Sequence, residues 1–207
     1  MTNETQDCVL IKFALENVNR AITQEPFDQR ITEIMIDSEN RDYFKIKLEN
    51  MGLLDLGGAK SGIVSLENLI EHLGISDGTI VDPCNIGISY DSRIKSSQTD
   101  ALSYLLKLPS SSRVNIKSCG LDDYIMPEGD LGRAYARRIV EEIYRVLPEG
   151  GIYFSSYSEP LEREARKIFQ QAEIFPKEFR QLSESLLVSI PHLKVFEKRS
   201  AEGNFSK

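Results

Sequence analysis

Residues 52 to 62 of the chain read Gly52-Leu-Leu-Asp-Leu-Gly-Gly-Ala-Lys-Ser-Gly62. The apolar run within this stretch is typical of a buried parallel strand, and it ends directly at a pair of glycines. A helical spacing of apolar residues follows, at Ile63, Leu66, Leu69, Ile70 and Leu73. A strand, a glycine turn and a helix in this order let the backbone approach a nucleotide-like ligand at a helix N-terminus. Asp55 is charged inside the apolar strand, which predicts either a ligand contact or a carboxylate that caps its own turn.

The composition is that of a globular protein. The chain has 207 residues, of which 41% are hydrophobic and 28% charged, and this fits one α/β domain with a sizeable core. No apolar run approaches the ~20 residues of a membrane span, so we expect no membrane insertion. The three cysteines form neither a CxxC pair nor a Cys/His cluster, which predicts a reducing compartment and no metal site. The polar and acidic N-terminus is unlike a secretory signal, so we expect a cytoplasmic protein. The net charge of −7 does not favour nucleic acid as a partner, although it leaves room for a local basic patch.

Residues 1–51 are predicted to form a helical extension that caps one end of the fold. Apolar residues four and three apart predict a helix over residues 8–22, and Pro26 is expected to interrupt the chain after it. A second short helix is predicted around Ile31 to Met35. Residues 42–48 fit a helix and a strand equally well.

Strands and helices alternate from residue 53 onward. We expect strands at 53–56, 79–82, 92–99, 114–118 and 152–155, and helices at 63–73, 101–108, 133–147 and 160–172. Residues 186–190 and 193–196 are predicted to form a terminal antiparallel pair, and residues 201–207 a frayed tail. This order predicts an α/β domain over residues 52–200, with a mostly parallel, doubly wound sheet and helices on both faces.

Polar groups follow several of the predicted strands. Ligands of doubly wound sheets lie beyond the carboxyl ends of the central strands. Four groups fall at such ends, and we expect them to converge on one crevice: the turn from Asp55 to Gly62, then Asp82, Thr99-Asp100 and Ser118 to Gly120.

The glycine turn is compatible with more than one ligand. A phosphate-binding P-loop requires GxxxxGK[ST], which is excluded because Ile63 and Val64 follow Gly62. The dinucleotide pattern GxGxxG is half met by Gly57, Ala59 and Gly62, with a methyl group at the position where the backbone must approach a pyrophosphate.

Three segments resemble motifs of the class I S-adenosylmethionine-dependent methyltransferases. The stretch from Leu53 to Gly62 is similar to their first motif, and Ile80-Val-Asp82-Pro83 to their second, whose acid binds the ribose hydroxyls. The segment from Arg145 to Gly151 resembles the "RvLkPGG" sequence that precedes their fifth strand, and Gln98 to Ala101 lies where the family has an acid and a small residue beside the adenine. The resemblance covers about residues 50–198.

The resemblance implies a Rossmann-like methyltransferase fold, S-adenosylmethionine as cofactor and methyl transfer to an acceptor. A small-molecule acceptor is favoured, because the chain shows neither an added recognition domain nor a strongly basic tail. The implied cofactor-binding residues are Asp55, Gly57, Gly58, Ala59, Gly62, Asp82, Pro83, Thr99, Asp100, Ala101, Ser118 and Cys119. Asp122, Asp123 and Tyr124 follow the fourth strand and imply a substrate site, with a solvated acidic loop as the alternative. No residue is assigned as a catalytic base.

Two departures from the family pattern support a different hypothesis. Ala59 and Ser61 stand where the family has glycines, and no Asn/Asp-Pro-Pro-Tyr motif follows the fourth strand. These differences favour, as an alternative, a non-catalytic methyltransferase-like protein that acts through a protein partner. A nucleotide-dependent oxidoreductase is a third hypothesis, which rests on the partial GxGxxG match alone.

Overall fold

A six-stranded sheet forms the centre of the protein, with the strand order β3-β2-β1-β4-β5-β6. The computed structural model describes residues 3–17, 25–38, 40–58, 61–84, 87–118, 121, 129–156, 159–169 and 193–198. The strands are β1 (Gly52–Leu56), β2 (Asp77–Val81), β3 (Ile94–Ser97), β4 (Val114–Ser118), β5 (Ile152–Ser156) and β6 (Leu193–Glu197). The first five are parallel, and β6 runs antiparallel to β5.

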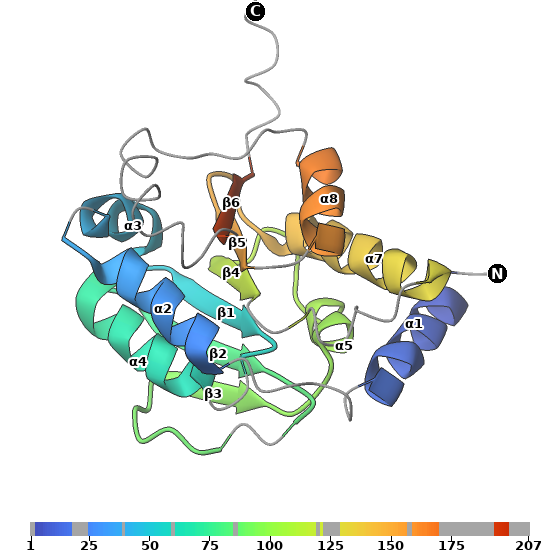
Figure 1. The fold of residues 1–207 in the computed structure, drawn as a ribbon, viewed down its shortest axis with the longest axis horizontal. Helices are drawn as coiled ribbons and strands as arrows, with labels where there is room; N and C mark the ends of the chain where they lie inside the picture. Colours follow the sequence, from blue (N-terminus) through green and yellow to red (C-terminus); the bar gives the residue numbers. More distant parts are fainter. Residues whose placement is uncertain are drawn as a thin grey trace, which may run out of the picture.

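Helices cover both faces of this sheet (Figure 1). They are α1 (Asn3–Asn17), α2 (Glu25–Ile36), α3 (Arg41–Leu48), α4 (Ser61–Leu73), α5 (Ala101–Leu105), α7 (Asp130–Val146) and α8 (Glu159–Ile168). Helices α2, α3 and α4 share one hydrophobic core with the sheet, and α1, α5, α7 and α8 share the other. The mostly parallel, doubly wound α/β architecture predicted from the sequence is therefore confirmed. None of the described helices is long and apolar enough to cross a bilayer.

The apolar run of β1 is explained by burial on both faces. Leu53 belongs to the core under α4, whereas Leu54 and Leu56 belong to the core under α7. Because side chains alternate along a strand, Asp55 lies on the same face as Leu53. The strand therefore directs one carboxylate into the layer beneath α4.

The N-terminal helices differ in detail from the sequence expectation. Helix α1 begins at Asn3, earlier than the predicted residue 8, and residues 18–24 lie outside the described part of the chain. Pro26 does not separate two helices but lies in the first turn of α2. An N–H in that turn has no partner within the helix, so its absence in proline costs no hydrogen bond. Residues 42–48, which the sequence left undecided, are helical and bury Phe44 and Leu48.

The two edges of the sheet agree in part with the sequence prediction. Strand β3 is present where a strand was expected, although it is shorter than residues 92–99. Residues 193–196 do form an antiparallel strand, and its partner in the described part of the chain is β5. The expected strand at 186–190 and the tail at 201–207 lie outside the described residues.

The segment from Arg145 to Gly151 joins three elements. The Arg145 guanidinium donates to the carbonyls of Leu105 and Leu108 at 2.8 Å each, which ties α7 to the end of α5. Gly150 has φ = 72°, a conformation that favours glycine, and its N–H donates to the Lys198 carbonyl beside β6. These contacts give a structural reason for an arginine and a glycine in this segment.

Candidate functional site

The glycine turn brings backbone to the carboxyl end of β1. Gly57 has φ = 80°, and its N–H donates to the Val81 carbonyl of the neighbouring strand β2. A Cβ added at Gly58 would lie 2.5 Å from Asp55 Oδ2, so only glycine fits above that carboxylate. Helix α4 begins at Ser61, whose hydroxyl donates to the Gly58 carbonyl at 2.9 Å. Gly58 therefore lies directly against Asp55.

Asp55 has a buried cation as its partner. Its Oδ2 accepts a hydrogen bond of 2.8 Å from Lys117 Nζ, and both side chains are 0% exposed. The ammonium also donates to Ser65 of α4 at 3.1 Å, and that hydroxyl lies 2.6 Å from the hydroxyl of Thr32 in α2. A polar chain therefore runs from α2 through α4 and β4 to the floor of the glycine turn. Sequence reasoning missed Lys117, because in β4 it takes a polar position of the alternation that Asn115 also follows, which is the pattern of a solvated side chain.

One cavity collects predicted residues from three separate segments. Its lining includes Gly57 after β1, Pro83 after β2, and Asp100 with Ala101 at the start of α5. Parallel strands present their carboxyl ends at the same edge, which is why these segments meet. The remaining lining residues are Ala14, Val81, Leu121 and Tyr135.

Two carboxylates lie at this edge in defined hydrogen bonds. Asp82 directly follows β2 and is 1% exposed, and its Oδ1 accepts the Cys84 N–H at 2.7 Å. Asp100 caps α5, accepting the Ser103 N–H at 3.0 Å. Thr99 precedes it, with its N–H bonded to the Ser97 carbonyl. Both acids are therefore fixed in orientation before any ligand arrives.

Tyr135 is a residue of this cavity that the sequence pattern did not single out as a site residue. It comes from α7 and is 1% exposed. Burial, together with the negative charge of Asp100, raises the pKa of its hydroxyl well above the ordinary value of 10.0. Its position in the helix stripe, next to Ala136, made it resemble an ordinary core residue.

The remaining predicted positions fall into two groups. Gly62 lies inside α4, where an added Cβ would come 2.9 Å from Asp55 Oδ2. Ser118 ends β4, and its hydroxyl lies 2.9 Å from the Tyr153 hydroxyl in the interior. The others lie outside the described residues, namely Ala59, Cys119, Asp122, Asp123 and Tyr124. Among the described residues, no group of three or more His, Cys, Asp or Glu side chains is arranged to hold a metal ion.

The fold can be compared with those of known proteins. No protein-family model matches the chain, and no curated protein sequence matches it. Among solved structures, a complex between a methyltransferase activator and a protein described as a methyltransferase, from Haloferax volcanii, superposes with a TM-score of 0.51 at 15% identity, over 86% of this chain and 100% of that one. The N-methyltransferase NodS from Bradyrhizobium japonicum gives a TM-score of 0.51 at 12% identity, with the same coverage. The chain has the class I methyltransferase fold.

S-adenosylmethionine is the cofactor that the sequence resemblance implies, and the residues at this edge can be compared with what that cofactor requires. The donor set fits, because a carboxylate ends β2, a second acid caps α5 and a glycine turn ends β1. The space does not fit while α1 is in place. The cavity has no volume that a water-sized molecule could enter, whereas ligand pockets measure ~300–1,000 Å³, and Ala14 of α1 forms part of its wall.

Proposed function

We propose that this protein binds S-adenosylmethionine at the carboxyl ends of β1 and β2 and transfers its methyl group to an acceptor. The observation that carries the proposal is the cavity at this edge. Gly57, Pro83, Asp100 and Ala101, which come from three separate segments, line it together, and Asp82 directly precedes Pro83. We favour a small-molecule acceptor and a cytoplasmic location.

When bound, S-adenosylmethionine would supply a methyl group on a positively charged sulfur. The acceptor would attack the methyl carbon in line with that sulfur, which would leave as a neutral thioether. The contribution of the chain is to hold the reactants in line and to exclude water. Asp82 would accept charge-assisted hydrogen bonds from the ribose hydroxyls. Asp100 and Ala101 would lie beside the adenine. Gly57 would let the backbone come close to the cofactor. Asp55 would act through the turn that it supports, because its carboxylate is bonded to Lys117.

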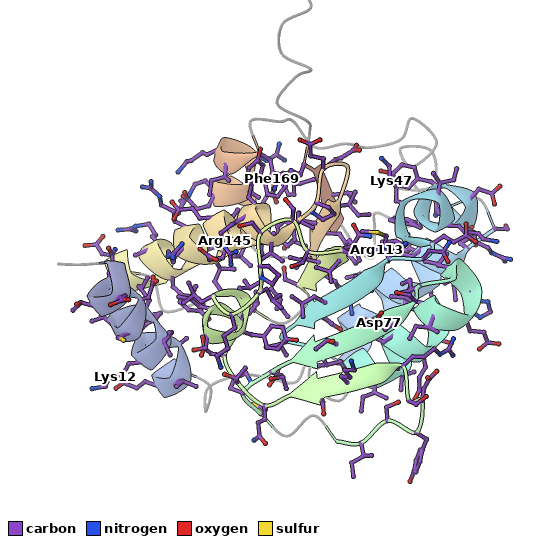
Figure 2. The ribbon with its side chains drawn as sticks, turned by 180° about the vertical axis from the view of Figure 1, so that it is seen from behind. Lys12, Lys47, Asp77, Arg113, Arg145 and Phe169 are labelled. Carbon is purple, nitrogen blue, oxygen red and sulfur yellow. The ribbon has the colours of Figure 1, made fainter. Side chains whose placement is uncertain are left out.

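Titration calorimetry of the full chain with S-adenosylhomocysteine and S-adenosylmethionine tests this proposal. We expect binding that Asp82→Ala weakens at least about tenfold, because the hydroxyls then lose an anionic acceptor. Asp77→Ala is the matched control, since Asp77 is an exposed acid at the opposite end of the same strand (Figure 2). Equal losses in the two variants would count against the assignment of Asp82.

The volume of the cavity favours a second function. A non-catalytic methyltransferase-like protein needs no open crevice, and a cavity without room for a water-sized molecule suits that function. A solved structure of similar fold is itself a complex with an activator protein, which supports a role in protein assembly. No calorimetric signal with either sulfur ligand at millimolar concentration would favour this function. Binding of a nicotinamide nucleotide in their place would favour an oxidoreductase.

A further inference from the structure

Helix α1 lies at the side of the molecule toward which the arrows of β1, β2 and β3 point (Figure 1). Leu10 and Ala14 are buried on it, at 1% and 2% exposed, and the partly buried Ile11 and Phe13 pack against the same core. Ala14 forms part of the wall of the cavity that Gly57 and Asp100 also line. Val9 and Leu15, which flank this buried side, are each 46% exposed. Thus the apolar side of α1 closes the cavity that begins at the glycine turn.

An ion pair links the N-terminal half of this helix to α7. Arg138 of α7 donates to both carboxylate oxygens of Asp7, at 2.8 and 3.1 Å. The same guanidinium donates to Glu142 at 2.6 Å, and Glu142 accepts from Arg145 at 2.6 Å. A bidentate pair of this kind fixes geometry as well as charge. The position of α1 is therefore coupled to α7 through a short chain of charges.

The ion pair is within reach of the solvent. A groove of about 620 Å³ runs between α1, α7 and α8, and Asp7 and Arg138 are among the residues that line it together with Arg133, Arg137 and Lys167. The side chains of Asp7 and Arg138 are 12% and 24% exposed. Dissolved salt can therefore screen this pair, unlike the fully buried pair of Asp55 and Lys117.

We propose that α1 is an autoinhibitory cover: it occupies part of the S-adenosylmethionine site, and the ligand binds only when the helix moves away. The inference rests on the proposed function and concerns the regulation of the same site. When only a fraction of molecules has an open site, the apparent dissociation constant rises in inverse proportion to that fraction. Any change that loosens α1 therefore tightens ligand binding.

Asp7→Asn tests the proposal in the full chain, because it keeps the side-chain shape and leaves Arg138 paired with Glu142. We expect S-adenosylhomocysteine to bind about tenfold more tightly than to the parent. Glu16→Gln is the matched control, since it removes an acid of the same helix whose ion pair with Lys12 is exposed at both side chains. Added salt should tighten binding to the parent protein and have little effect on Asp7→Asn.

Hydrogen exchange supplies a second measurement. Amides of residues 3–17 should exchange faster in the presence of S-adenosylhomocysteine, because the bound state releases the helix. Ligand binding with equal dissociation constants in parent and Asp7→Asn, and with unchanged exchange in α1, would overturn the cover and leave the proposed function standing. Weaker binding to Asp7→Asn would also overturn it, since α1 would then be part of the ligand site. Absence of binding to the parent and to both variants would overturn the cover and the proposed function together.

Discussion

Replacement of Lys117 by methionine isolates the energetic role of the buried ion pair. Lys117 and Asp55 are both 0% exposed, and their charged atoms lie 2.8 Å apart. Methionine fills nearly the same volume, so the main effect is to leave the Asp55 carboxylate without its cation. Removal of one partner from a buried pair costs about 3–5 kcal/mol. For a chain of this length, such a loss lowers the melting temperature by roughly 6–20 °C.

Urea denaturation followed by circular dichroism measures this cost, provided that the slope of the transition is unchanged. Two further proteins calibrate it. Lys47→Met removes a lysine whose pair with Glu197 spans 2.7 Å but is about a quarter exposed at both side chains, so we expect a loss of at most about 1 kcal/mol. Asp55→Leu combined with Lys117→Met removes both buried charges and should recover most of the stability. A single Lys117→Met variant no less stable than Lys47→Met would refute the reasoning.

Two further predictions concern α7. Arg145→Lys should cost about 1–3 kcal/mol in urea denaturation, because an ammonium cannot reproduce the planar fork that reaches Leu105, Leu108 and Glu142 together; stability equal to the parent would contradict this role. For Tyr135, burial raises the hydroxyl pKa above its ordinary value of 10.0. Above pH 10 the unfolded state releases the phenol proton, whereas the folded state keeps it. The contribution of Tyr135 to the free energy of unfolding is therefore fully present below pH 10 and falls by about 1.4 kcal/mol per pH unit above it. Tyr135→Phe should remove this share of the alkaline loss between pH 9 and 11, and an unchanged pH profile would contradict it.

The sheet could be predicted because its signals are local. The apolar run of β1 and the helical stripe of α7 each lie within a single element, and the sequence shows both directly. The meeting of Gly57, Pro83 and Asp100 at one cavity also followed from a general rule, since parallel strands share one carboxyl edge. The role of each side chain at that edge could not be predicted in the same way.

Two features depended on contacts between distant parts of the chain. Asp55 pairs with a lysine 62 residues later, and only the register of β1 against β4 places the two side by side. The sequence offered a ligand contact or a turn for Asp55, and neither hypothesis included a buried cation. The place of α1 above the cavity depends likewise on how it docks against α5 and α7, which its own apolar spacing cannot specify.

The salt bridge between Asp7 and Arg138 has a consequence for the order of folding during synthesis. The two residues are separated by 131 positions, so α1 leaves the ribosome long before its partner in α7 is made. During that interval Leu10 and Ala14 have no core to enter, and contacts of such long range form late because the intervening chain must first be ordered. We expect the helix that is synthesised first to dock last. Variants that weaken its docking should accordingly speed its release and leave the folding rate of the sheet unchanged.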